Sequence, residues 1–454
     1  MFKVDISKVL EFVKDKSYSD IVKESQKYGL CVKYSNDEQL KNLFLLANKN
    51  ETTKNETTES EKIESEKIES DIINYQANGI IFEKSTNKVV AMCQNKLIDC
   101  DSDFIFKSGT VKRIEYCEDG TMIKLYNYNG TWYTSTTRCI DASKSYWSST
   151  KSFSDLFWDV FDKSLLDTLD KQYTYVFVLL HKENRIVVRH KINMLVYISR
   201  INNETYIEDY TQQFNNVYGI RRPKKLDINI NINEFHPFKR GILIKTLNKE
   251  NNQLVSYKID YKNYTNIKSL RGNIPDVRMR YLELLPEPEL LKQFEKNYYE
   301  YKFMFNIIKN EIFNLVKMIH RLYVDSHIKH SIQVNDYNLY YKTLKQLHAQ
   351  YKITNVPISF YEVQKKIFTM DKKIVKRLLM WEDLKFPKSN KNKLNETTNE
   401  TTNETTNETT NETTNETTNE TTNETTNETT NETTNETTNE SVVNESVVNE
   451  SVVN

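Results

Sequence analysis

Hydrophobic residues recur at helical spacing near the start of the chain. Residues 5–28 place apolar side chains one helical turn apart, at Ile6, Val9, Leu10 and Val13. We therefore expect a helix there, and a second short helix from Glu38 to Ala47. Residues 50–70 are polar and repetitive, which predicts a disordered insertion.

Alternating apolar and polar residues then predict a body rich in β-strands. Residues 79–93 read as a hairpin, and the clearest hairpin covers residues 122–137 around Asn129-Gly130. A helix is expected over residues 152–167, with Ser152 as its N-cap. Further strands are predicted at residues 174–180, 185–188, 193–201, 241–245 and 254–259.

The pattern turns helical from Pro288 to about Asp383, where residues 294–324 could form one long helix. The chain ends in eleven NETT repeats and three NESVV repeats, which have no large apolar residue to bury and predict a disordered tail. Each repeat also contains a glycosylation sequon, but without a secretory signal we expect an unmodified acidic spacer.

The net charge of zero averages two unlike parts. The tail from Asn395 onward contains fourteen Glu and no Lys, Arg or Asp, so residues 1–394 carry 63 basic against 49 acidic residues. A basic body favours phosphate-bearing partners, here RNA or DNA, although the same excess could be scattered, solvated lysines.

Targeting and cysteine signals point to an intracellular protein. The start of the chain carries Lys3, Asp5 and Lys8 among its apolar residues, and no uncharged apolar run approaches the length of a membrane span. The five cysteines form no CxxC pair, so a disulfide framework is not expected. We expect the host cytoplasm or a virion if the chain is viral. The Lys-, Asn- and Ile-rich composition is typical of AT-rich genomes, such as those of giant DNA viruses or some protists.

Five segments of the chain carry short motifs that occur in a recognisable order. The sequence Cys117-Glu-Asp-Gly120 resembles the nucleophile motif KxDG, and residues 78–83 resemble the upstream strand RGxxFE. Residues 177–187 resemble FEFVSPxNRIV with NRIV intact. Residues 240–245 resemble EGxVxK, and residues 257–261 resemble KxKxxxY. These are motifs of the phage-type, tRNA-repair RNA ligases, which are covalent nucleotidyltransferases, and the chain therefore resembles that family.

The resemblance covers about residues 75–285 and implies an α+β fold, with an antiparallel-sheet, ATP-grasp-like nucleotidyltransferase core and a C-terminal helical domain. The implied division has five parts. They are an N-terminal helical segment (1–49), a low-complexity linker (50–72), the RNA-ligase-like domain (73–287), a helical domain (288–390) and the disordered repeat tail (391–454).

The departures from the family's motifs concern the residues that would perform the chemistry. Cys117 replaces the nucleophilic lysine, Val178 replaces a metal-associated glutamate, and Arg240 replaces the glutamate of EGxVxK. A cysteine cannot form the lysine phosphoramidate, and a cation at position 240 opposes a bound metal ion. We therefore expect a catalytically inactive, RNA-ligase-like protein that binds nucleic acid or a protein partner.

The resemblance leaves candidate positions for phosphate or nucleotide binding, namely Asp119, Gly120, Arg185, Lys245 and Lys258, with Arg240 adding a further cation. Tyr126, Tyr128, Trp132 and Tyr133 could stack bases, although ordinary strand filling is the simpler interpretation. No metal site or cofactor is expected, since His320, His327 and His330 lack completing ligands.

Two alternatives stay open. The first is an active ligase with a displaced nucleophile, which would need ATP and Mg²⁺. Lys124 is a candidate for that nucleophile, whereas the side chain of Lys112 would lie on the opposite face of the strand from Cys117. The second is a structural or interaction protein that acts through its helical domain and tail.

Overall fold

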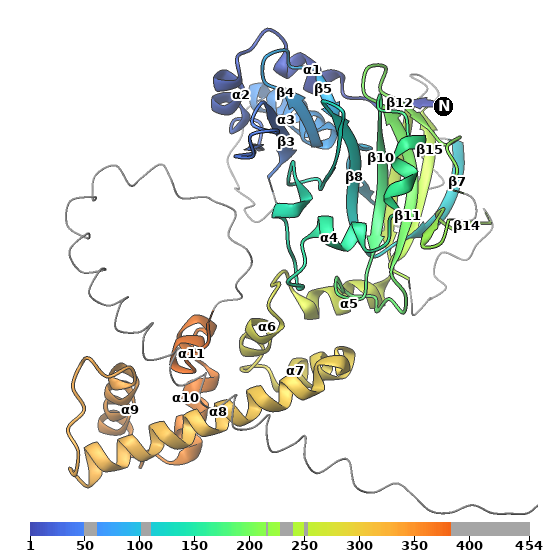
Figure 1. Cartoon of the computed structure of the whole chain (residues 1–454). Coiled ribbons are helices and arrows are strands. Elements are labelled where there is room, and N and C mark those ends of the chain that lie inside the picture. Colours follow the sequence, from blue (N-terminus) through green and yellow to red (C-terminus); the bar gives the residue numbers. More distant parts are fainter. Residues whose placement is uncertain (50–60, 101–109, 215–216, 228–238, 249–252, 383–454) are drawn as a thin grey trace, which may run out of the picture. The chain divides into compact units, whose positions relative to one another are not determined.

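The computed structural model describes residues 1–49, 61–100, 110–214, 217–227, 239–248 and 253–382. It has a mixed α+β architecture with one large sheet, one small sheet and a run of C-terminal helices (Figure 1). The repeat tail predicted to be disordered lies outside the described residues, as does the first part of the predicted linker.

The N-terminal part combines helices with the small sheet. The predicted helix over 5–28 is present as two helices, α1 (Ser7–Val13) and α2 (Tyr18–Ser25). The small antiparallel sheet has the order β2 (Leu30–Tyr34), β3 (Leu43–Asn48), β4 (Asn78–Glu83) and β5 (Val89–Ala91). It therefore joins strands from both sides of the predicted linker and confirms the hairpin over residues 79–93.

Two predictions in this part are wrong. Residues 43–48 form the central strand β3, buried at every position, and not a helix, because β2 and β4 pair with its two edges. Residues 61–76 form helix α3 (Glu61–Gln76), although residues 50–70 were expected to be disordered. Ile73 and Ala77 are buried at the end of this helix among residues of α1, β3 and β4, which gives the segment a core to pack against.

The large sheet has the order β14-β7-β15-β16-β1-β12-β11-β10-β8-β9, with β13 beside β11 and β6 beside β16. Most of its pairings are antiparallel. Its strands are β1 (Phe2–Lys3), β6 (Ile98–Asp99), β7 (Thr110–Cys117), β8 (Thr121–Tyr128), β9 (Thr131–Ser135), β10 (Tyr173–Leu180), β11 (Met194–Asn202), β12 (Ile207–Asp209), β13 (Ile220–Arg221), β14 (Lys225–Leu226), β15 (Gly241–Asn248) and β16 (Gln253–Asp260).

Residues 220–226 connect two distant parts of this sheet. Their first part, β13, pairs with β11, and their last part, β14, pairs with β7. Four strands separate β7 from β11 along the sheet, so one short segment can reach both only because the sheet bends strongly. The bend brings side chains of β7 and β11 to the same cavity.

The hairpin turn and the helix start predicted within the β-rich body are confirmed. The β8–β9 hairpin turns at Asn129 and Gly130, both with positive φ, as a two-residue turn of this sequence requires. Helix α4 (Phe153–Trp158) begins at the predicted Ser152, which forms a capping box with Asp155. The helix ends earlier than expected, and short 3-10 turns cover Ala142–Lys144 and Lys163–Thr168.

Helices follow the last strand. They are α5 (Lys262–Arg271), α6 (Val277–Glu283), α7 (Pro288–Asn297), α8 (Lys302–Tyr323), α9 (Tyr341–Thr354), α10 (Phe360–Phe368) and α11 (Lys372–Leu378). The predicted single helix over 294–324 is broken by a 3-10 turn at Tyr299–Tyr301, and a π-helical turn, Val324–Ile328, follows α8. Helices α5 to α11 share one apolar core, and none of the described helices is long and apolar enough to cross a membrane.

Candidate functional site

Cys117 lies at the end of β7, opposite Gly241, and Gly241 in turn pairs with Asp260 on β16. Arg240, Asp260, Lys258 and Asp119 all act electrostatically on the Cys117 thiol. Three of the ligase-like segments, each read separately from the sequence, therefore converge at one end of three neighbouring strands.

The Cys117 side chain is buried, which raises the pKa of its thiol to about 11, while the positive charge of Arg240 acts in the opposite direction. At neutral pH the group is therefore a protonated thiol. A thiol in this state is a poor nucleophile, and it has no amine chemistry to offer an α-phosphate.

Arg240 and Asp260 form an ion pair with each other. The Nε of Arg240 donates to Oδ1 of Asp260 at 2.8 Å, and Nη2 donates to Oδ2 at 3.3 Å. In the resemblance to the ligase motifs, Arg240 replaces a glutamate and Asp260 replaces the second lysine of KxKxxxY. The two residues thus form a pair of reversed charge, and the carboxylate of Asp260 is neutralised by a cation.

Lys258 extends this ion pair into a network. Its Nζ lies 3.5 Å from Oδ2 of Asp260 and 2.7 Å from Oδ1 of Asp99. Lys258 is largely buried, whereas Asp99 is mostly exposed. A phosphate that approached Lys258 would have to compete with both carboxylates.

The Asp119-Gly120 turn is held by close contacts. Oδ2 of Asp119 accepts from the N–H groups of Val187 and Val188 at 2.9 and 2.7 Å, and Oδ1 accepts from the Tyr264 hydroxyl at 2.6 Å. These bonds explain why residues 185–188 form an irregular segment instead of the predicted strand. Both carboxylate oxygens are engaged, so Asp119 ties this segment to α5.

Gly120 is required by close packing against β10. A Cβ atom at this position would lie 2.4 Å from the carbonyl oxygen of Leu179 and 2.7 Å from Cγ1 of Val178. Val178 therefore lies against the turn that follows Cys117.

Lys124, the candidate displaced nucleophile, is fully buried, and its Nζ donates to the carbonyl oxygen of Gly79. Burial lowers its pKa to about 8. A neutral amine is what nucleophilic catalysis needs, but this amine has no exposed surface through which a nucleotide could reach it.

Arg185 and Lys245 already have protein partners. Arg185 forms an ion pair with Glu300, donates to the carbonyl oxygen of Asn297 and lies over the ring of Tyr298, so it joins the body to the helices. Nζ of Lys245 lies 3.6 Å from Glu115.

The predicted stacking aromatics divide between two hydrophobic cores. Tyr126 and Tyr128 are buried with Tyr133 packed against them, and Trp132 packs against the α4 core. Strand filling thus explains these side chains.

A cavity of about 510 Å³ lies between β7 and β11. Among the described residues, its lining contains no carboxylate and four cations: Arg113, Arg221, Arg222 and Lys225. Tyr197, Tyr210 and Phe214 line it as well, and the guanidinium of Arg222 stacks on Tyr197 at 4.3 Å.

These residues were not predicted from the sequence. The basic run Arg221-Arg-Pro-Lys-Lys225 is a visible signal, but Arg113 joins it only through the pairing of β14 with β7.

Comparison with known proteins gives a distant viral relative. The chain is 23% identical over 348 residues to the immediate-early protein ICP-46 homolog of Invertebrate iridescent virus 6, covering 67% of this chain and 72% of the relative. No protein-family model matches the chain.

Solved structures with partial similarity include a protein provisionally named as an ATP-dependent DNA ligase from Aquifex aeolicus. It is 10% identical with a TM-score of 0.36, covering 67% of this chain and 81% of that one. An archaeal ATP-dependent RNA ligase is 9% identical with a TM-score of 0.34, covering 63% and 69%. At these values we transfer no residue roles from the ligases.

Proposed function

We propose that this protein binds a phosphate-bearing ligand, the backbone of a single-stranded RNA or a free nucleotide, in the cavity between β7 and β11 without transferring a nucleotidyl group. The observation that carries the proposal is the lining of that cavity, whose described residues include four cations, three aromatic rings and no carboxylate, although Arg113 and Arg221 form ion pairs with Glu115 and Glu118 outside the lining. Cations attract phosphates, and the half-buried rings of Tyr210 and Phe214 offer surfaces on which bases stack, whereas Tyr197 is buried.

The proposed lack of catalysis rests on the cluster around Cys117. The thiol is protonated, the neighbouring carboxylate of Asp260 is paired with Arg240, and both oxygens of Asp119 accept protein hydrogen bonds. A divalent ion with ATP would find neither an amine nucleophile nor an unpaired carboxylate among these groups.

Two neighbouring lysines allow a sharp test of the binding site. Lys225 lines the cavity, whereas Lys224 precedes it on the chain and does not. Both are exposed, so their replacement leaves the core intact. We expect Lys225→Glu to weaken binding of a labelled single-stranded RNA by at least about tenfold in fluorescence anisotropy, and Lys224→Glu to have a much smaller effect.

The salt dependence separates the site from general charge attraction. Removing one phosphate contact with Lys225→Gln should lower the slope of log affinity against log salt by about 1. Equal losses for Lys224→Glu and Lys225→Glu would reject the cavity as the binding site. Absence of salt-dependent binding to RNA or ATP would reject the proposal as a whole.

Covalent chemistry is tested separately by incubating the full chain with radiolabelled ATP or GTP and Mg²⁺. We expect no acid-labile, alkali-stable protein adduct. An adduct that disappears in Lys124→Met would establish the displaced-nucleophile alternative instead.

A further inference from the structure

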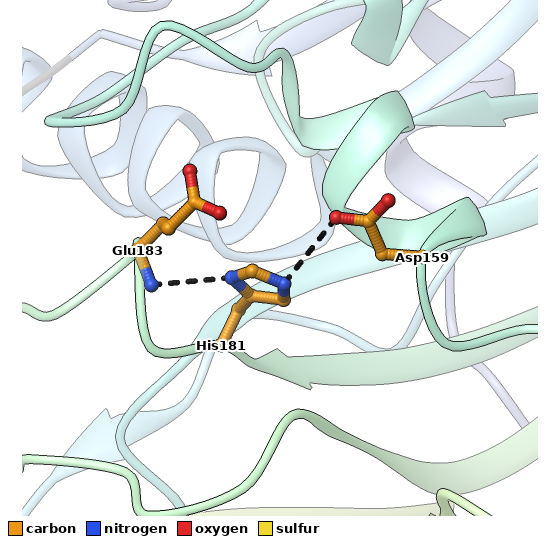
Figure 2. Close-up of side chains that lie close together, drawn as sticks. All are labelled: Asp159, His181 and Glu183. Carbon is orange, nitrogen blue, oxygen red and sulfur yellow. Dashed lines mark hydrogen bonds and ion pairs between the residues drawn. The ribbon is translucent and has the colours of Figure 1, made fainter. Parts of the chain in front are cut away.

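Asp159 and the nearby pair His181 and Glu183, which are about twenty residues apart in sequence, meet beside α4. Asp159 caps the C-terminus of α4, His181 directly follows β10, and Glu183 lies in the turn after it (Figure 2). Each offers one ligand atom, and these atoms lie within 4.8 Å of one another.

Hydrogen bonding does not account for the Nε2 atom of His181. The side chain is only 2% exposed, and this atom is buried without a hydrogen-bond partner. It points at Oδ2 of Asp159 from 3.6 Å, which is too long for a hydrogen bond. Two ligands bound to one tetrahedral Zn²⁺ at about 2.1 Å lie about 3.4 Å apart, so a shared ion fits this separation better.

A positive charge already occupies the space between the carboxylates. Nζ of Lys151 lies 2.7 Å from Oδ2 of Asp159 and 3.6 Å from Oε1 of Glu183. Lys151 is 44% exposed on a flexible stem, so its ammonium can move into solvent. Asp159 also lines an open surface cavity of about 490 Å³ beside Trp158 and Phe161, which gives an ion a path to the cluster.

We propose that Asp159, His181 and Glu183 bind a divalent first-row transition ion, with Zn²⁺ as the expected occupant, and that the ion replaces the ammonium of Lys151. One imidazole and two carboxylates form a ligand set that Zn²⁺ accepts, with a fourth position left for water. The Ser149 hydroxyl donates to Glu183 at 2.8 Å and orients it from behind. This site is independent of the proposed RNA-binding cavity.

The ring of His181 must change its tautomer before Nε2 can bind a metal ion. Nδ1 accepts from the Glu183 N–H at 3.2 Å, so the ring proton resides on Nε2. A metal at Nε2 displaces that hydrogen bond, and we therefore expect micromolar rather than nanomolar affinity.

Co²⁺ titration of the untagged full chain tests the site, since Co²⁺ reports its ligands by visible absorption. We expect one equivalent to bind, Zn²⁺ to displace it, and no thiolate charge-transfer band to appear. His181→Gln and Asp159→Asn should each weaken binding by at least about tenfold, whereas Lys151→Met should strengthen it. His330→Asn, at an exposed histidine outside the cluster, should bind Co²⁺ like the wild type.

Circular dichroism and thermal unfolding without metal establish that each variant is folded. The proposal is overturned if neither the wild type nor Lys151→Met binds one equivalent of Co²⁺. It is also overturned if folded His181→Gln binds as tightly as the wild type, or if the bound Co²⁺ shows thiolate absorption.

Discussion

Lys124 is a lysine whose environment favours the neutral amine. It is fully buried, and its pKa is lowered to about 8 from an ordinary value of 10.5 because burial penalises the ammonium. Its hydrogen bond to the carbonyl oxygen of Gly79 joins β8 of the large sheet to β4 of the small one. We therefore interpret it as a structural link whose charge state affects stability.

This lowered pKa predicts a pH dependence with a definite sign. Below pH 8 the folded protein carries a buried ammonium and is destabilised. Between pH 8 and 10.5 the folded state releases the proton while the unfolded state keeps it, so stability rises with pH by at most about 1.4 kcal/mol per unit. Urea unfolding of the wild type relative to Lys124→Met should show this rise between pH 7.5 and about 9.5.

The exposed Lys33 provides the matched control for this measurement, since Lys33→Met removes a solvated charge. Wild type relative to Lys33→Met should show no such rise over the same range. If the stability difference between wild type and Lys124→Met is constant with pH, the ammonium of Lys124 is not penalised by burial.

At the scale of elements, the predicted strands include β10, which is buried at almost every position, and β11, which is buried in part. The β8–β9 hairpin and strands β11, β15 and β16 follow from alternation and turn chemistry that act within a few residues. The segment 38–47 was misread because β3 is buried on both faces, which removes the alternation. Residues 185–188 have the sequence of a strand, but the N–H groups of Val187 and Val188 donate to the side chain of Asp119 instead of to a neighbouring strand.

The candidate site was predictable only in part, because its contacts join residues that are distant in the sequence. Motif order identified Cys117, Arg240 and Lys258, but not that Arg240 pairs with Asp260, since the pairing depends on the register of β15 against β16. The cavity cations were missed because Arg113 and Arg221 are far apart in sequence, and only the bend of the sheet brings them together.

The reversed-charge pair predicts coupled effects on stability. Arg240→Met leaves Asp260 largely buried with only the more distant Lys258 as a cation, and Asp260→Asn leaves Arg240 without its anion. Each should lower the free energy of unfolding by about 1–3 kcal/mol, and the double variant should cost at least about 1 kcal/mol less than the sum. Urea unfolding of the wild type, the two single variants and the double variant gives the free energies of this double-mutant cycle.

An independent ion pair supplies the control for this cycle. Arg200 and Asp209 form a comparable contact of 2.7 Å elsewhere in the sheet. Arg240→Met combined with Asp209→Asn should therefore be additive within about 0.5 kcal/mol. Additivity of Arg240→Met with Asp260→Asn as well would mean that the two residues do not stabilise each other.

At the scale of the whole molecule, the sequence divides charge between a basic body and an acidic tail. Residues 1–394 carry a net charge of +14, and the fourteen Glu after Leu394 bring the chain to zero. The basic residues of the body therefore attract both the acidic tail and a polyanionic ligand, and the two compete for these residues whatever the tail's conformation. This competition should be strongest at low salt, where the Debye length is longest.

A chain that ends at Leu394 should accordingly elute from a heparin column at a higher salt concentration than the full chain and bind single-stranded RNA more tightly at low ionic strength. A full-length variant with the fourteen tail Glu changed to Gln separates charge from length and should behave like the truncated chain. The gain in RNA affinity should shrink toward zero as salt approaches about 1 M, because screening removes long-range repulsion. If the truncated chain binds more tightly but the Gln variant does not, the tail hinders ligands by its bulk, and its charge is incidental.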